Sequence, residues 1–499
     1  MYAKKISFEQ ITITILLGLG ILIPLIHFLC NRSMGNDEAW LALNIIHKGY
    51  AELLQPLDYN QVAPVLFLMI EKFFSTLIPN SEYGLRLFPL LCYWISLFFF
   101  YQITRILFNN NKFTNILALS LFILNYYLIY YSNEGKQYIC DVLVCTAIMY
   151  FILKNYQKER TRLYILGIVG ALAIFLSSVA PIILSTAGLY LLYEQFHIKK
   201  TKNIAGMTII FVVWLSVFAV YYYFFVFNHP AKESMEMYWS ATKGFLPLDS
   251  LSESLWFIGA KVWSTLNMFS RRIPIIIIIV MLLISGIFNI IREKKIGLMI
   301  IICFPVIIHL LLSALHLYPF GIRFIMYFLP GLMLICTAGF KYIITGLSAH
   351  FKSFNLKLLY FIPIIFLFSF PEFPIQTSEG RDLRFEVKES IKFLKENVSD
   401  DETIYMYWLG GAIFKYYQDI GFANFKIPVI IGTEAYKDPE YEQNLFKVLD
   451  NIHGKCWLFF VRDTWGGQEF IINHLDSMGY NKIKEYKTSC SSIYLYDFK

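Results

Sequence analysis

The sequence has few charged residues for its length. Only 16% of its 499 residues are charged, whereas 57% are apolar and 18% are aromatic. A soluble globular domain carries roughly a quarter charged residues, so the shortage excludes that class and indicates a polytopic membrane protein. The net charge of +7 therefore does not indicate a nucleic-acid partner, and we expect the basic residues to orient cytoplasmic loops.

The eight cysteines form no CxxC pair and no Cys/His cluster at ligand spacing, which argues against a structural zinc site. Cys456 and Cys490 are the two in a soluble-looking stretch. Both lie in strand-like segments of a predicted oxidising compartment, so a disulfide between them stays open. The sequence also lacks a solenoid-type repeat and a cleavage site after the first apolar run, which we expect to be a retained helix.

Long apolar runs predict about eleven membrane-spanning helices. They centre on residues 9–29, 86–107, 114–131, 139–153, 163–179, 181–196, 204–227, 273–291, 297–315, 324–344 and 357–372. Every second connecting loop is basic, with Lys112, then Lys154, Lys158, Arg160 and Arg162, then Lys199, Lys200 and Lys202, then Arg292, Lys294 and Lys295, and then Lys352. The positive-inside rule predicts a cytoplasmic N-terminus and an extracytoplasmic C-terminal region.

One apolar segment, "APVLFLMIEKFFSTLIP", does not fit as a span. Glu71 and Lys72 lie at its centre, Pro64 and Pro79 bound it, and a crossing here would invert every later loop. We expect it to lie in the outer interface as an amphipathic helix, or to dip in and return. Residues 31–84 are then one long outer loop with at least two juxtamembrane helices, the first being "DEAWLALNIIHKGYAELL".

Helical and strand periods alternate from about residue 373 to the C-terminus. This pattern predicts a small α/β domain at 373–499, with helices packed on a partly parallel sheet. The predicted architecture is thus an α-helical membrane domain, residues 1–372, followed by an extracytoplasmic α/β domain.

Charged residues from distant outer loops are expected at one face of the membrane. The acids are Asp37, Glu38, Asp58 and Glu134, and the cations include Lys136, Arg271, Arg272 and Arg323. Such a set offers a carboxylate that can take a proton and cations that can hold an anion.

Structural interpretations of these residues stay open. Asp37 and Glu38 stand where a helix would start, with Asn36 as N-cap, and acids are favoured in a first turn. Glu134 and Lys136 also fit a solvated turn between spans.

Arg271 and Arg272 fit an interface anchor that meets lipid phosphates. His309 and His316 fit hydrogen-bonded residues better than metal ligands.

Four motifs in order carry a family resemblance. They are the Asp-Glu pair after the first span, "LDYNQVAPVLFLMI" followed by "EYGLRLFPLL", then "YSNEGKQY", and finally "YPFGIRFIMYFLP". In this arrangement the chain resembles the C-type (GT-C) membrane glycosyltransferases that use lipid-phosphate sugars. It is similar to the group of protein O-mannosyltransferases and lipid A aminoarabinose transferases, which is glycosyltransferase family 39-like. The C-terminal domain also resembles the extracytoplasmic domain of many bacterial members.

The resemblance implies an enzyme of the bacterial cytoplasmic membrane that transfers a hexose or pentose from a polyprenyl-phosphate donor. The acceptor would be a glycan, a lipid or a protein at the outer face, and the anomeric centre would be inverted. Asp37 is the expected base, and Glu38 either assists or orients it. The expected substrate-binding residues are Glu134 for sugar hydroxyls and Lys136 and Arg323 for the phosphate, with Tyr138, Gln61, Arg271 and Arg272 around them.

The chain departs from the family pattern at two places. Gln61 in "QVAP" stands where many relatives have a lysine, and Lys136 stands where arginine is common, which loses the planar fork that grips a phosphate. No cofactor is required by the sequence, and no compact ligand spacing supports the divalent metal that Asp37, Glu38, Glu134 and His316 would bind if they converged.

Three other functions stay open. A lipid-linked glycan flippase or transporter should carry polar residues mid-helix and an internal repeat. This chain keeps its predicted spans almost free of charge, collects acids at their outer ends and shows no repeat. An O-antigen-type polymerase or ligase should concentrate Arg and His in one large outer loop. An envelope scaffold would leave Asp37 with no role beyond helix capping.

Overall fold

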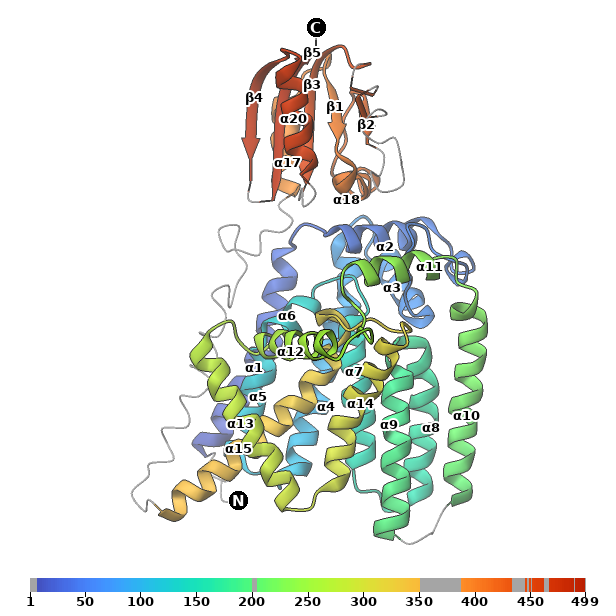
Figure 1. Cartoon of the computed structure of the whole chain (residues 1–499), viewed down its shortest axis with the longest axis vertical. Helices are drawn as coiled ribbons and strands as arrows, with labels where there is room; N and C mark the ends of the chain where they lie inside the picture. The colour runs from blue at the N-terminus through green and yellow to red at the C-terminus, as the bar shows by residue number, and fades with distance from the viewer. Residues whose placement is uncertain are drawn as a thin grey trace, which may run out of the picture. The chain divides into compact units, whose positions relative to one another are not determined.

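The computed structural model describes residues 7–199, 204–350, 387–432, 445–446, 448–449, 451–461, 466–488 and 490–498. Up to residue 350 the described chain is helical (Figure 1). Its longer helices are α1 (Phe8–Cys30), α2 (Asn36–His47), α3 (Val65–Leu77), α4 (Glu82–Leu107), α5 (Lys112–Ile123), α6 (Tyr126–Tyr131), α7 (Tyr138–Leu153), α8 (Glu159–Leu176), α9 (Ala180–Tyr193), α10 (Ile204–Tyr222), α11 (Lys232–Ala241), α12 (Leu251–Asn267), α13 (Ile273–Arg292), α14 (Ile296–Ala314) and α15 (Leu329–His350). Short helical turns are η1 (Glu52–Leu54), η2 (Glu194–Lys199), η3 (Tyr223–Phe227), η4 (Ile322–Phe324) and η5 (Met326–Phe328).

Six helices in the described part are long and apolar enough to cross a membrane. They are Phe8–Cys30, Glu82–Leu107, Ile204–Phe227, Ile273–Arg292, Ile296–Ala314 and Met326–Ser348. The other predicted spans correspond to α5 with α6, to α7, to α8 and to α9, and residues 357–372 lie outside the described residues. A multi-pass membrane chain is confirmed, but the predicted number of eleven spans is not.

The predicted span at 114–131 is interrupted by an asparagine. Asn125 lies between α5 and α6, and its Oδ1 accepts a hydrogen bond from the Leu128 amide at 3.1 Å, so it caps α6. Its Nδ2 donates to the Met268 carbonyl at 2.8 Å. One polar side chain therefore caps the start of α6 and ties it to the segment before α13.

Two glycines let α13 and α15 approach closely. A Cβ on Gly286 would lie 2.0 Å from the Ile335 carbonyl oxygen, and one on Gly339 would lie 2.0 Å from that of Leu282. Small residues allow this kind of backbone contact between membrane helices. The packing fixes the helices that follow Arg271–Arg272 and Arg323.

The first outer loop contains the two predicted helices, in shorter form. The segment 37–54 is α2, which ends at His47, followed by the single 3₁₀ turn η1. The helix α3 begins at Val65, directly after Pro64, and ends at Leu77. Their location in the membrane interface stays a prediction.

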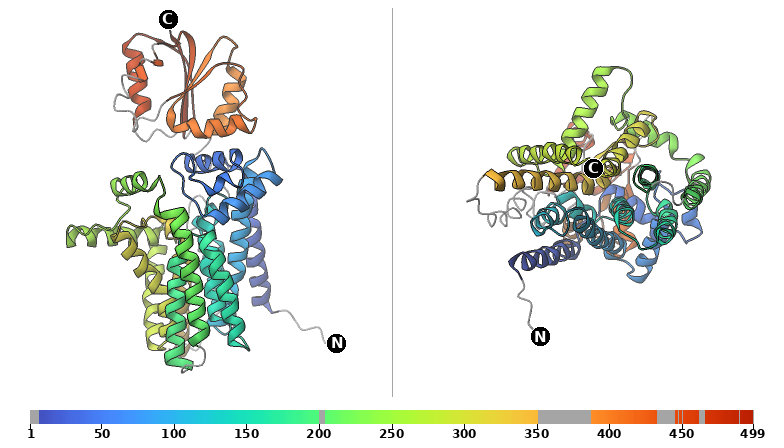
Figure 2. Two further views of the ribbon diagram at one scale, coloured as in Figure 1. Left: turned by 90° about the vertical axis from the view of Figure 1, so that its right-hand side faces the viewer. Right: turned by 90° about the horizontal axis from the view of Figure 1, so that it is seen from below.

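The C-terminal part is a helix-covered mixed sheet, as predicted. Its strands β1 (Thr403–Met406), β2 (Val429–Ile431), β3 (Gly454–Val461), β4 (Asn481–Lys487) and β5 (Ser491–Phe498) lie in the order β2-β1-β3-β5-β4. The strands β2, β1 and β3 are parallel, and β5 and β4 complete the sheet antiparallel. The described helices are α17 (Val387–Asn397), α18 (Trp408–Asp419) and α20 (Gly467–Ser477), and Figure 2 shows helices on both faces.

The central strand β3 explains this layering. Its run "CWLFFV" is buried throughout, which is typical of a strand covered on both faces. Trp457 contacts Phe393 of α17, with ring centroids 5.9 Å apart, while Leu458 shares a core with Ile471 and Leu475 of α20. Successive side chains thus face opposite helices.

The register excludes the disulfide that the sequence left open. Cys456 of β3 is paired with Tyr496 of β5, while Cys490 precedes Ser491, whose partner is Val461. Five residue steps along a strand amount to about 17 Å, too far for a disulfide. Neither residue forms a disulfide, and burial raises the pKa of Cys456 to about 12.

The chain divides into two compact units. One comprises the described residues within 1–26, 50–70 and 86–374, and the other comprises 27–49, 71–85 and the described residues from 387 onward. Two stretches of the first outer loop thus belong to the same unit as the C-terminal sheet. The sequence did not predict this association.

Candidate active site

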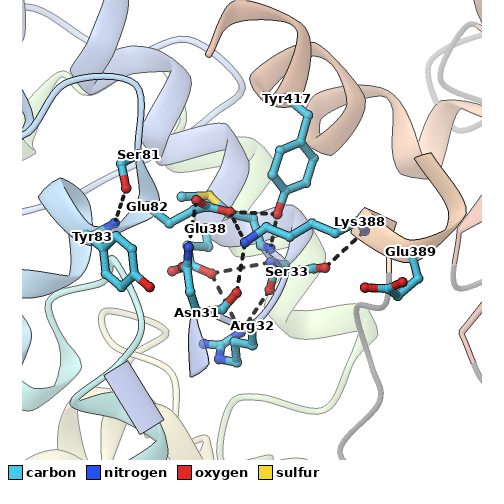
Figure 3. Close-up of polar contacts among 12 residues, drawn as sticks. Asn31, Arg32, Ser33, Glu38, Ser81, Glu82, Tyr83, Lys388, Glu389 and Tyr417 are labelled. Carbon is cyan, nitrogen blue, oxygen red and sulfur yellow. Dashed lines mark hydrogen bonds and ion pairs between the residues drawn. The ribbon is translucent and has the colours of Figure 1, made fainter. Parts of the chain in front are cut away.

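The start of α2 carries the Asp-Glu pair. The predicted helix start is nearly correct, but Gly35 is the N-cap and Asn36 is the first helical residue. Glu38 is buried, and its Oε2 accepts a hydrogen bond from the Gly35 amide at 3.4 Å. The same oxygen lies 3.7 Å from Nη1 of Arg32 (Figure 3). The Glu38 carboxylate therefore folds back over the helix start.

Asp37 lies beside this capping residue and differs from it in exposure. Asp37 is partly exposed, whereas Glu38 is 1% exposed. The helix start is favourable for a carboxylate because the helix dipole and the first amide groups stabilise negative charge there. Of the two acids, Asp37 is the more exposed, and the geometry favours the capping role for Glu38.

Lys136 and Gln61 meet in the other unit. Lys136 Nζ donates to Gln61 Oε1 at 2.8 Å, and both side chains are buried, at 5% and 8% exposure. The Gln61 amide in turn donates to the Tyr59 carbonyl at 3.2 Å. Gln61 thus holds the Lys136 ammonium in place.

Arg323 lies among aromatic rings. Its guanidinium carbon is 5.6 Å from the centroid of Tyr138 and 5.2 Å from that of Trp239. Aromatic faces attract a guanidinium and fix its direction. The Tyr138 ring in turn contacts that of Tyr131, with ring centroids 5.4 Å apart. Arg323 and Tyr138 are therefore neighbours, and Glu134 lies in the turn between α6 and α7.

The pair Arg271 and Arg272 is more exposed than the other predicted cations. Both side chains are exposed ahead of α13, and the guanidinium of Arg271 lies 5.9 Å from the ring centroid of Tyr126 on α6. This arrangement agrees with an interface anchor as well as with a secondary contact to substrate.

Asp141 is a buried acid that the sequence analysis missed. It lies in the first turn of α7, is 1% exposed, and its Oδ1 accepts from Ser177 Oγ at 2.6 Å. Burial raises the pKa of the Tyr318 phenol well above its ordinary value. The nearby Asp141 and Tyr138 add to this rise. The sequence carried a signal for Asp141, because a carboxylate inside an apolar run is energetically costly and seldom without a role.

The two histidines are hydrogen-bonded or stacked, as expected. His309 Nδ1 lies 3.0 Å from the Tyr327 hydroxyl and Nε2 lies 3.0 Å from the Pro319 carbonyl oxygen. His316 stacks on Phe245, with ring centroids 4.6 Å apart. Among the described residues, no three His, Cys, Asp or Glu side chains are grouped so that they could hold a metal ion.

The predicted site residues are divided between the two units. Asp37 and Glu38 belong to the unit that contains the C-terminal sheet. The other unit contains the remaining predicted residues, which are Gln61, Glu134, Lys136, Tyr138, Arg271, Arg272 and Arg323. Within it, Lys136 is joined to Gln61, and Arg323 to Tyr138.

Comparisons with known proteins give the chain a family context. Residues 61–223 match the family described as dolichyl-phosphate-mannose-protein mannosyltransferase. No curated protein sequence matches. The crystal structure of ArnT from Cupriavidus metallidurans bound to undecaprenyl phosphate is similar over 97% of both chains, with a TM-score of 0.54 and 10% identity. The apo state of that ArnT gives a TM-score of 0.42 and 11% identity over 98% of both chains.

The family match covers Gln61, Glu134, Lys136 and Tyr138, and the ArnT likeness extends to the C-terminal sheet. The chain is a multi-pass membrane protein with the fold of ArnT, and its predicted resemblance to the C-type membrane glycosyltransferases is confirmed.

Proposed function

We propose that this protein is an integral-membrane glycosyltransferase. It transfers a sugar from a polyprenyl-phosphate donor to an acceptor at the outer face of the membrane, in glycosylation of an envelope glycan, a lipid or a protein. The observation that carries the proposal is the match of residues 61–223 to the mannosyltransferase family. The likeness to an ArnT that was crystallised with undecaprenyl phosphate supports the class of lipid.

Asp37 is the proposed general base. Its carboxylate takes the proton of the acceptor hydroxyl as the acceptor oxygen bonds to the anomeric carbon from the face opposite the phosphate. The bond between that carbon and the phosphate oxygen breaks in the same step, and its electron pair leaves with the polyprenyl phosphate. The anomeric centre is inverted, and the step balances without a cofactor.

Lys136 and Arg323 are the proposed phosphate contacts. The leaving phosphate gains negative charge as the bond breaks, and fixed cations stabilise that charge without reorganising. Gln61 holds the Lys136 ammonium at 2.8 Å, and aromatic rings orient the Arg323 guanidinium. The two cations are therefore held in place before the donor arrives.

The remaining residues have supporting roles in the proposal. Glu134 binds sugar hydroxyls, Tyr138 packs beside the head group, and Arg271 and Arg272 meet lipid phosphates near the donor. In the proposed topology the N-terminus is cytoplasmic, and both the reaction site and the C-terminal domain are extracytoplasmic.

Mass spectrometry of envelope glycans and lipids tests the function. Cells that make the wild-type protein should contain a glycosylated product that is missing from cells without the protein and from cells that make Asp37→Asn. Loss of a precursor from the outer face, with the sugar unattached to any acceptor, would contradict a transferase and support a flippase. A change in polymer length alone would support a polymerase or ligase.

A further inference from the structure

A short segment joins the first membrane helix to the helix of the proposed base. It runs from residue 31 to residue 35, between Cys30 at the end of α1 and Asn36 at the start of α2. Its central residues are buried, with Met34 at 0% exposure and Ser33 at 7%. Anything that holds this segment therefore also sets the position and direction of α2.

Two residues of the C-terminal domain hold the segment at three points. The Tyr417 hydroxyl accepts a hydrogen bond from the Met34 amide at 2.9 Å. The Lys388 amide donates to Ser33 Oγ at 3.1 Å, and the Lys388 ammonium donates to the Asn31 carbonyl at 2.8 Å. Lys388 comes from α17 and Tyr417 from α18, so two separate helices make these contacts (Figure 3).

The same two side chains converge on Glu82 at the start of α4. The Tyr417 hydroxyl donates to Glu82 Oε1 at 3.1 Å, Lys388 forms an ion pair with that oxygen, and Asn31 Nδ2 donates to Oε2 at 3.2 Å. Glu82 is 4% exposed. A buried carboxylate with three donors is a strong anchor, because removing one partner leaves a charge without compensation. We call Asn31, Glu82, Lys388 and Tyr417 the Glu82 network.

The far end of α2 is also attached within this unit. Lys72 Nζ donates to the carbonyls of Ile45 and Ile46, at 2.8 and 3.1 Å, and thereby caps the last turn. His47 Nε2 lies 2.9 Å from Asp419 Oδ2 at the end of α18. The helix α18 thus contacts the segment before α2 through Tyr417 and the end of α2 through Asp419.

We propose that Tyr417 and Lys388 are positioning residues for Asp37, so that the C-terminal domain fixes the position of the base. This inference rests on the proposed function, since it takes Asp37 as the base. Met34 is three residues before Asp37, and its buried amide needs an acceptor in any arrangement of the segment. Without Tyr417 that amide would turn elsewhere, and α2 would start in a different direction.

The test compares Tyr417→Phe with Tyr496→Phe. Tyr496 is a matched control, because it is a buried tyrosine of the same domain and its hydroxyl donates to Asp476 at 2.9 Å, away from residues 31–35. Each variant loses one hydroxyl and its hydrogen bonds. A second pair is Lys388→Met with Lys392→Met, since Lys392 is an exposed neighbour on α17 that pairs with Glu389.

Three readouts use the full-length protein. Hydrogen exchange measured by mass spectrometry should be faster in residues 31–38 of Tyr417→Phe and Lys388→Met, and unchanged there in both controls. Product formed in cells, at matched protein level, should fall about 10- to 100-fold, since a displacement near 1 Å can cost 100-fold. Affinity of the purified protein for undecaprenyl phosphate should stay within about 3-fold of wild type. General destabilisation would lower both product formation and lipid affinity, so a loss of product alone indicates positioning.

The outcomes separate the two claims. Unchanged exchange in residues 31–38 of Tyr417→Phe, or equal loss of product in Tyr417→Phe and Tyr496→Phe, would overturn the positioning role. Faster exchange together with a fully active Asp37→Asn variant would overturn the proposed base, and with it the link from the Glu82 network to catalysis. An inactive Asp37→Asn variant with unchanged exchange in Tyr417→Phe would leave the proposed function intact and refute the positioning role alone.

Discussion

Replacing Lys136 by methionine should weaken binding of undecaprenyl phosphate without unfolding the protein. Lys136 is 5% exposed, and its ammonium is held by Gln61 Oε1 at 2.8 Å. A hydrogen bond to a charged group contributes about 1.5–3 kcal/mol, and 1.4 kcal/mol is a factor of ten in affinity. We therefore expect the Kd to rise about 10- to 150-fold.

The stability of this variant can be separated from its affinity. Methionine keeps most of the lysine volume, but it leaves the buried Gln61 oxygen without this donor, at a cost of about 1–3 kcal/mol. Replacing both residues, as Gln61→Met with Lys136→Met, removes both partners of the hydrogen bond and should restore stability. The double variant should nevertheless bind the lipid as weakly as Lys136→Met.

The assay is titration of undecaprenyl phosphate into the purified protein in nanodiscs, with thermal unfolding measured in parallel. Lys112→Met is the matched control, because Lys112 is a partly exposed cation of the same unit that pairs with Glu9. It should bind with wild-type affinity. Wild-type affinity in Lys136→Met, or equal weakening in Lys112→Met, would refute the assignment of Lys136 to the phosphate.

Two further predictions concern packing. In wild-type protein treated with a maleimide at neutral pH, peptide mass spectrometry should find Cys490 modified and Cys456 unmodified. Cys456 should not react because it is fully buried and burial raises its pKa to about 12. Modified Cys456 in folded protein would contradict the described sheet. Ser177→Ala should lower the free energy of unfolding by about 1–3 kcal/mol, because it removes a donor from the buried Asp141 carboxyl, and thermal unfolding that matches wild type would contradict this contact.

Local sequence patterns predicted much of the fold. The apolar runs located the six long membrane helices, and alternating periods located the C-terminal α/β domain, because both signals are carried by neighbouring residues. The interruption of the span at 114–131 by Asn125 was not predicted. Its effect depends on a hydrogen bond to Met268, which lies 143 residues away.

The candidate site was predictable only in part, for the same reason. The helix start at Asp37 has a local signature, and the acid at Glu38 indicated a capping role. Two contacts of the Glu82 network join residues 335 and 357 positions apart, each of an ordinary type for its segment. No spacing rule connects such residues, so the attachment of α2 to the C-terminal domain emerged only from the structure.

The hydrogen bond between Gln61 and Lys136 gives Gln61 a role that the sequence did not indicate. By the family resemblance, the sequence places Gln61 where a cation is expected. In the structure, its amide oxygen accepts from the Lys136 ammonium. Gln61 is thus a neutral group that orients the Lys136 charge.

The most direct test of the account is the rate of sugar transfer by Asp37→Asn, measured with the same full-length preparation that is tested for undecaprenyl phosphate binding. Asparagine keeps the shape of the side chain and cannot take the acceptor proton at neutral pH. The account predicts a loss of at least about 100-fold in transfer, with lipid affinity and unfolding temperature close to wild type. Transfer at the wild-type rate would contradict the assignment of Asp37 as the base.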